Sequence, residues 1–216
     1  MKRMTILWAT RALCTAMLIP ACTPADEGDD ETAGETAGET AGETAGEDDL
    51  VVTTELGGGA YKTVIDGSDE EAWRYFDFES RAHVAPDAPE DDPSWDLGVL
   101  RFNVKSNGGT SGSGGAAVAI LEGTSFDAVT EAPSEGFVED AAAAPGSGGE
   151  MGDTSPGYAF DNWFAYDPMS HTLAPVGGRI YVVRTPEANH YKVEMLGYYD
   201  GAGTPGFVSF RWAALP

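Results

Sequence analysis

Three short runs of β-forming residues near the C-terminus constrain the fold of this chain most strongly. They span residues 179–184, 191–199 and 207–212, they are rich in Tyr, Val and Phe, and segments with Pro, Gly and Asp separate them. Branched and aromatic residues in runs of this length, bounded by turn residues, are typical of strands joined by short connections. We therefore predict an antiparallel meander for this part of the chain.

Earlier segments carry further strand patterns. Residues 99–105 place Leu100, Phe102 and Val104 on one face and polar side chains on the other, and an Asn-Gly turn signal follows. This alternation predicts a half-buried strand over 99–105. The apolar run AAVAIL at residues 116–121 predicts either the returning strand of a hairpin or a buried strand beside it.

Only one segment carries a good helix-start signal. Ser68 is followed three residues later by Glu71, a capping box in which the two side chains satisfy N–H groups of the first turn. We expect at most a turn or two of helix there, with a strand resuming at residues 74–78. With 28 glycines, 13 prolines and no long leucine-rich periodic stretch, the chain is predicted to fold as an all-β, mostly antiparallel single domain over residues 50–216.

Residues 1–21 are predicted to be a lipoprotein signal peptide. Basic residues stand near the start, and the apolar run over residues 12–21 is too short to span a bilayer as a permanent helix. Ala21 precedes Cys22 as in a bacterial lipobox, so we expect Cys22 to be lipidated with fatty acids such as palmitate. The alternative is an ordinary secretory signal cleaved near Ala21, which leaves Cys22 as a free thiol.

A lipid on Cys22 anchors the protein to a membrane of the cell envelope. Thr23 follows the cysteine, and by the sorting rule of enteric bacteria this residue favours the outer membrane. We therefore expect an outer-membrane lipoprotein, facing either the periplasm or the cell surface.

Residues 22–49 are predicted to form a disordered acidic tether after the lipidated cysteine. From residue 25 the segment contains only Ala, Thr, Gly, Asp and Glu, and the motif Glu-Thr-Ala-Gly repeats along it. A helix is disfavoured because each glycine costs about 1 kcal/mol relative to alanine, and like charges four residues apart repel. Without large apolar side chains the segment cannot contribute to a core.

The charge balance excludes one large class of partners. The chain has 12 basic and 36 acidic residues, a formal net charge of -24. A field of this sign repels phosphate backbones, so we expect no binding to nucleic acid.

Motifs for catalysis or metal binding do not stand out. No Gly-x-Ser-x-Gly elbow is present, and the histidines at 83, 171 and 190 have no metal-ligand spacing. The glycine-rich segment 108–115 lacks the Lys-Ser/Thr ending of a phosphate-binding loop, so we predict a flexible or close-packed hairpin turn there. Without a nucleophile, a base and an orienting group in view, we expect no enzyme.

Residues 60–212 contain a series of different motifs rich in aromatic residues and glycine. They are WRYFDF (73–78), SWDLGV (94–99), RFNVKSNGGTSG (101–112), IYVVR (180–184) and GFVSF (206–210). In their order and spacing these motifs resemble the HmuY family of bacterial haem-binding lipoproteins. The resemblance implies an all-β fold and a lipid-anchored or shed protein that captures haem and passes it to an outer-membrane haem receptor.

The resemblance also implies where a haem ligand set lies. Family members hold the iron with axial His, or in some relatives Met, from two loops. Here the first region has no histidine and contains Met151, while Pro168 fills the approximate position of the second ligand, with Met169 and His171 beside it. These three side chains, Met151, Met169 and His171, are the candidate axial ligands, and haem iron is the only metal expected.

Nearby aromatic residues are candidates for covering the porphyrin. They are Trp163, Phe164 and Tyr166. The alternative hypothesis is a surface-displayed β-domain of the same fold that has lost haem and binds a protein, a glycan or another small ligand.

Overall fold

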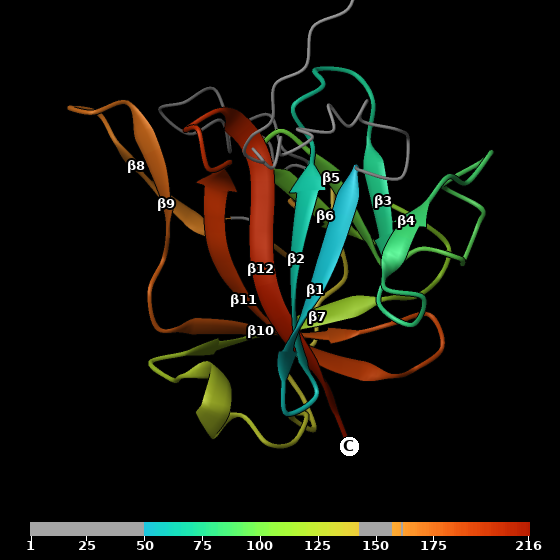
Figure 1. Cartoon of the computed structure of the whole chain (residues 1–216). Coiled ribbons are helices and arrows are strands. Elements are labelled where there is room, and N and C mark those ends of the chain that lie inside the picture. Colours follow the sequence, from blue (N-terminus) through green and yellow to red (C-terminus); the bar gives the residue numbers. More distant parts are fainter. Residues whose placement is uncertain (1–49, 143–156, 161) are drawn as a thin grey trace, which may run out of the picture. The chain divides into compact units, whose positions relative to one another are not determined.

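The C-terminal strands form the centre of the larger of two main sheets (Figure 1). The computed structural model describes residues 50–142, 157–160 and 162–216. Strands β10 (Arg179–Arg184), β11 (His190–Tyr199) and β12 (Pro205–Leu215) pair antiparallel in chain order. The predicted meander is therefore confirmed.

The larger sheet has six strands in the order β1-β2-β12-β11-β10-β7, and every pair is antiparallel. The hairpin of β1 (Val51–Gly57) and β2 (Ala60–Asp66) extends it on one side, and β7 (Ala117–Glu122) extends it on the other. The apolar run of β7 pairs with β10 and not with the strand that precedes it in the chain. The predicted strand is therefore confirmed, and of the two alternatives the hairpin is wrong.

The smaller sheet has the order β4-β3-β5-β6. Its strands are β3 (Arg74–Asp77), β4 (Ala82–Val84), β5 (Leu97–Leu100) and β6 (Asn103–Ser106). A third, two-stranded sheet consists of β8 (Phe164–Asp167) and β9 (Thr172–Pro175). With antiparallel pairing in all three sheets, the predicted all-β, mostly antiparallel fold is confirmed.

The alternation over residues 99–105 does not form one strand. A two-residue turn at Arg101 and Phe102 divides it, and Arg101 has a positive φ of 54°. Val99 pairs with Val104, and both side chains are buried in the core. An unbroken strand would place these two residues on opposite faces, so burial of both side chains favours the turn.

The main core contains side chains from both large sheets. Phe76 of β3 lies 5.8 Å from Phe210 of β12 between ring centroids, and Phe78, just after β3, lies 5.0 Å from Trp212. Phe78 also stacks on Tyr191 at 4.6 Å. Aromatic side chains bury large areas, so these cross-sheet contacts hold the two sheets face to face.

A second, smaller cluster covers the opposite face of the larger sheet. It includes Ile180 and Val182 of β10, together with Phe126 of the short 3-10 helix η2 (Phe126–Ala128). Tyr181 and Val183 of the same strand belong to the main core. Strand β10 is thus buried on both faces, which explains why its sequence IYVV is apolar without interruption.

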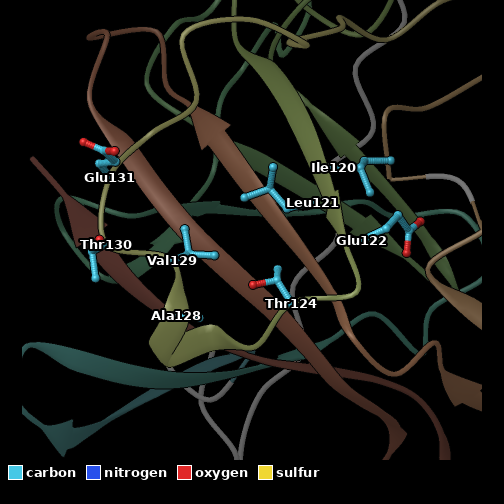
Figure 2. A pocket seen from close by; sticks show the side chains of 8 residues that line it. All are labelled: Ile120, Leu121, Glu122, Thr124, Ala128, Val129, Thr130 and Glu131. Carbon is cyan, nitrogen blue, oxygen red and sulfur yellow. The ribbon is translucent and has the colours of Figure 1, made fainter.

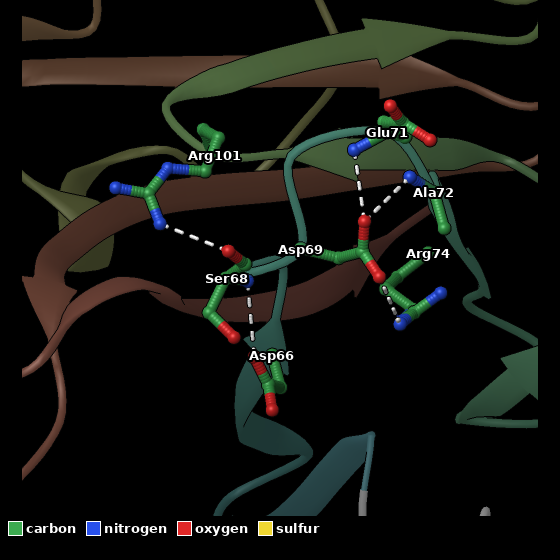
Figure 3. A network of polar contacts seen from close by, with 7 residues as sticks. All are labelled: Asp66, Ser68, Asp69, Glu71, Ala72, Arg74 and Arg101. Carbon is green, nitrogen blue, oxygen red and sulfur yellow. Dashed lines mark hydrogen bonds and ion pairs between the residues drawn. The ribbon is translucent and has the colours of Figure 1, made fainter.

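The predicted capping box does not start a helix. Asp69, not Ser68, supplies the capping oxygen: its Oδ1 accepts hydrogen bonds from the N–H groups of Glu71 at 2.8 Å and Ala72 at 2.9 Å (Figure 3). The backbone is already extended at Arg74, where β3 pairs with β5. One polar turn is all that fits between the end of β2 and this pairing.

The glycine-rich segment is a close-packed crossover between the two sheets and not a hairpin turn. It joins β6 of the smaller sheet to β7 of the larger one. It wraps the buried Asn107, whose Nδ2 donates to the carbonyl oxygens of Asp92 and Trp95, both at 2.8 Å. A Cβ at Gly108 would lie only 1.9 Å from the carbonyl oxygen of Ala116, so only glycine fits there.

Several predictions concern residues outside the described ones. The signal peptide over 1–21, the lipidated Cys22 and the tether over 22–49 all fall there. Among the residues that the structure does describe, no helix has the length and apolar character needed to cross a membrane.

Candidate functional site at the β8–β9 hairpin

The turn between β8 and β9 carries two of the predicted ligands, and local hydrogen bonds fix its shape. Asp167 accepts a bond from the N–H of Met169 at 2.8 Å through Oδ1 and one from the hydroxyl of Ser170 at 2.7 Å through Oδ2. These bonds lower the pKa of the Asp167 carboxyl because they favour its charged form, and the bond from Ser170 has the largest effect. The turn is therefore ordered by its own polar groups and not by burial.

His171 closes this turn in an unusual backbone conformation. Its φ is 55°, and its Nδ1 lies 2.6 Å from the hydroxyl oxygen of Tyr166 on the facing strand. A histidine that binds a metal commonly engages its second ring nitrogen in a hydrogen bond to oxygen, which fixes the ring and the tautomer. In the tautomer whose Nδ1–H donates to the Tyr166 oxygen, Nε2 keeps a lone pair that could bind iron, so this donor fits haem ligation.

Met169 lies at the tip of the same turn. Its side chain is 90% exposed, so the thioether sulfur is open to an approaching ligand. Because Met169 and His171 are only two residues apart on one turn, we interpret them as alternatives for one axial position. Sulfur and imidazole nitrogen are both haem-iron ligands.

The predicted aromatic residues occupy different depths. Trp163 is buried in the main core, and its indole N–H donates to the carbonyl oxygen of Phe102 at 2.8 Å. Phe164 is half-buried and contacts the ring of Phe102 at 5.4 Å. Tyr166, also half-buried, lies further along the hairpin beside His171. Trp163 and Phe164 thus lie at the base of the hairpin, while Tyr166 lies beside the candidate ligand His171.

The base of the hairpin rests on a rigid turn of the smaller sheet. The N–H of Arg101 donates to the carbonyl of Gly67 at 2.7 Å, and its Nη1 donates to the carbonyl of Ser68 at 2.9 Å (Figure 3). A Cβ at Gly67 would meet Val99 Cγ1 at 2.7 Å, so this close approach requires glycine. The network positions Phe102, the residue that receives Trp163.

The β8–β9 hairpin has a second attachment, which joins β9 to β11 of the larger sheet. The N–H of Leu173 donates to the hydroxyl oxygen of Tyr199 on β11 at 3.0 Å. Figure 1 shows β8 and β9 as a separate arm beside β11. The hairpin is thus held at its base and along one side, while its tip is exposed.

The third candidate ligand, Met151, lies outside the described residues, but the flanks of its segment are described. The buried Asp140 accepts hydrogen bonds from the N–H of Ser106 and from the N–H of Ala159, both at 2.8 Å. In addition, Ala141 donates to the carbonyl of Gly157 at 3.1 Å. The chain on either side of residues 143–156 is therefore held together at Asp140.

Sequence reasoning missed Asp140. It stands after Glu139 in a stretch without an apolar pattern, and such a pair looks like a solvated loop. Burial raises the pKa of its carboxyl, while the bonds from Ala159, Ser111 and Ser106 oppose that rise. Only the fold, which brings β6 and residue 159 together, reveals its role.

A separate pocket of about 460 Å³ lies beside β7 (Figure 2). Its lining combines apolar side chains with two glutamates: Ile120, Leu121, Glu122, Thr124, Ala128, Val129, Thr130 and Glu131. None of the predicted haem residues within the described part of the chain is among them. The pocket is therefore a feature distinct from the β8–β9 hairpin.

Solved structures with a similar fold come from several bacteria. An apo HmuY analogue of Tannerella forsythia is 14% identical with a TM-score of 0.54, and the match covers 77% of this chain and 97% of that one. A Bacteroides fragilis protein, provisionally named a lipoprotein, is 18% identical with a TM-score of 0.55 over 78% and 97% of the two chains. A Bacteroides vulgatus protein, provisionally named an HmuY-like haem-binding protein, is 21% identical with a TM-score of 0.51 over 75% and 95%. At these identities the matches establish a shared fold.

A search of curated proteins gives no significant match. The family model described as HmuY protein, in contrast, matches residues 69–212. This range extends from the turn before β3 into β12 and includes the β8–β9 hairpin. The chain therefore belongs to the HmuY family.

Proposed function

We propose that this protein is a non-enzymatic, membrane-anchored lipoprotein that binds haem for haem or iron acquisition. The observation that carries the proposal is the 2.6 Å contact between Tyr166 and Nδ1 of His171, which orients an exposed imidazole as a metal ligand is oriented. Membership of the HmuY family and the likeness to a protein named for haem binding support it.

The candidate ligands divide between two segments. His171 would hold the iron through Nε2, with Met169 as the alternative donor on the same turn, and Met151 would be the donor from the other segment. Bound haem would supply an iron that accepts sulfur or imidazole nitrogen, and Tyr166 would keep the imidazole ring oriented.

A haemin titration of the purified protein tests this proposal. We expect saturation near one to one with a sharpened Soret band, weakened in His171→Ala and in Met151→Ala. His190→Ala is a matched control, because His190 lies on β11 and contacts Phe137 instead of the hairpin. A flat titration at micromolar haemin would reject haem and favour the alternative of a β-domain for another ligand.

Single variants identify the donor on the turn. If the imidazole of His171 is the donor, His171→Ala should weaken haemin binding and Met169→Ala should leave it unchanged. A complex that Met169→Ala weakens, and that His171→Ala leaves unchanged, would assign the position to Met169.

Tyr166→Phe tests the orienting bond separately. This variant keeps the ring and removes only the hydroxyl that contacts Nδ1. Loss of such an outer partner typically lowers metal affinity by about 10- to 100-fold. Unchanged haemin affinity in Tyr166→Phe would mean that the contact has no part in binding.

The membrane anchor is a separate element of the proposal. Cys22 is the proposed lipidation site, and the cell envelope, with the outer membrane preferred, is the proposed location. Labelled fatty acid should enter the wild-type protein and not Cys22→Ser. Equal labelling of both would reject the anchor while leaving the haem proposal unaffected. An outer-membrane receptor that accepts the haem is the partner expected from this function.

A further inference from the structure

Strand β7 forms one edge of the six-stranded sheet, and its outward backbone groups can be assigned. The N–H of Val118 donates to the carbonyl of Val138 at 2.8 Å, and the N–H of Val138 donates back at 3.0 Å. In antiparallel strands the N–H and C=O of one residue point to the same side, and alternate residues share that side. Ile120 and Glu122 therefore point their backbone groups away from β10, towards the open edge.

This edge already binds one extended segment. The Val118–Val138 pair is an isolated antiparallel bridge, and the chain before it bends at Gly136, where φ is 88°. No other described residue pairs with the edge at Ile120 or Glu122. Within the part of the chain that the structure describes, the edge therefore has the geometry for strand addition, with one position occupied and the next two open.

Exposed apolar and acidic side chains surround the open edge. Ile120 is 37% exposed and Val138 is 52% exposed. The glutamates at 131, 135 and 139 are all exposed on the segment that approaches and follows the bridge. Because the whole chain carries a net charge of -24, a second copy of it is repelled and a basic partner is attracted.

The pocket beside β7 adds room for side chains of a docked strand. Figure 2 shows Leu121 directed towards Val129, while Ile120 and Glu122 lie on the other side of the strand. Glu122 is paired with Arg179, whose Nη2 lies 2.7 Å from the Glu122 Oε1. The exposed carboxylates offered to a basic partner are therefore those of the glutamates at 131, 135 and 139. A strand in which basic and apolar residues alternate would match both these carboxylates and the apolar side chains.

We propose that the β7 edge at Ile120 and Glu122 binds an extended, basic segment of a partner protein by strand addition. The segment pairs antiparallel with β7 and contributes backbone hydrogen bonds, and its Lys or Arg side chains approach the surrounding glutamates. This interaction surface lies on the larger sheet and is independent of haem binding.

A fluorescent peptide of about eight residues, long enough to span an edge of this length, tests the proposal. Its Lys and Val residues alternate, and its binding to the purified protein is followed by fluorescence anisotropy. The matched control carries N-methyl groups on the amides that face β7, which keeps charge and composition but removes the donors. We expect at least about a tenfold loss of affinity for the methylated peptide, as for one or two lost backbone bonds.

Variants of the protein separate edge pairing from charge attraction. Ile120→Pro removes an N–H that points to the edge and not to β10, so the sheet pairing is kept, which a thermal melt verifies. Ile120→Thr is the control that keeps the N–H. We expect Pro to abolish peptide binding and Thr to keep most of it. Equal binding by both variants, equal binding of both peptides, or no binding of the basic peptide would each overturn the proposal.

Discussion

The main core between the two large sheets and the β8–β9 hairpin are stabilised by different interactions. In the core, Phe78 is 1% exposed and contacts aromatic rings from β3, β11 and β12. At the hairpin tip, Met169 is 90% exposed, and the turn is held by the carboxylate of Asp167. Burial thus fixes the scaffold, while short polar contacts fix the candidate ligands.

This difference suggests how one fold can hold different ligand sets. A turn stabilised by its own hydrogen bonds can exchange His for Met without disturbing the packed sheets, because few core contacts depend on it. Loops that carry functional residues on a rigid scaffold generally vary more than the scaffold itself. Substitutions should therefore have large effects on stability in the core and small ones at the tip.

Phe78→Ala should have the largest effect on stability. It removes a fully buried ring that stacks on Tyr191 at 4.6 Å and contacts Trp212 at 5.0 Å. We expect the free energy of unfolding to fall by about 3–5 kcal/mol, measured by denaturant titration. The control is Phe164→Ala at the half-buried base of the hairpin. If that variant lost as much stability, the contrast between the two regions would not hold.

Asp140→Ala should have the next largest effect, because the buried Asp140 joins β6 to the segment at residue 159. The variant leaves the buried N–H groups of Ser106 and Ala159 without their acceptor. We expect a loss of roughly 2–3 kcal/mol. Hydrogen exchange should also become faster at Ala159. A variant with wild-type stability and exchange would show that Asp140 does not hold these segments together.

The pH dependence of stability tests the interior of the scaffold at Asp96. Burial is the main cause that raises the pKa of its carboxyl from 3.8 to about 8, and the charges of Asp77 and Glu187 add to the rise. Between these two values the folded protein holds a proton that the unfolded chain releases. The free energy of unfolding should therefore fall as the pH rises from about 4 to about 8, by at most about 1.4 kcal/mol per unit.

Asp96→Asn isolates this contribution. The amide oxygen can still accept the hydrogen bond from the N–H of Phe78, which Asp96 accepts at 2.8 Å, and the group no longer titrates. The difference in stability between wild type and variant, measured by denaturant titration at several pH values, should change in this window. A constant difference from pH 4 to pH 8 would show that Asp96 titrates normally.

Sequence patterns predicted the pairing within the C-terminal meander and failed where a turn keeps the alternation. Residues 179–215 have long β-forming runs with clear turn residues between them, so the meander could be predicted. Residues 99–105 alternate across a turn at Arg101, a residue that seldom has a positive φ, so nothing in the pattern marks the break. The partner of β7 is distant in sequence and could not be found from local signals.

The candidate site could be predicted only in part, and for a different reason. The family resemblance directed attention to the segment with Met169 and His171, and the structure places both on one turn. It could not reveal that Tyr166 contacts His171, because that contact depends on the pairing of β8 with β9. Asp140 was missed because its partners, Ser106 and Ala159, lie 34 and 19 residues away in the chain.

Met169→Ala should have the smallest effect, and a second methionine makes the comparison direct. At the exposed tip the substitution removes almost no buried surface, so the free energy of unfolding should stay within about 0.5 kcal/mol of wild type. Met195 on β11 is 7% exposed and belongs to the main core. Met195→Ala should therefore cost about 2–5 kcal/mol in the same denaturant titration. If Met169→Ala instead lost more than about 1 kcal/mol, the tip would have to pack against the folded domain, because loss of exposed surface alone cannot account for such a change.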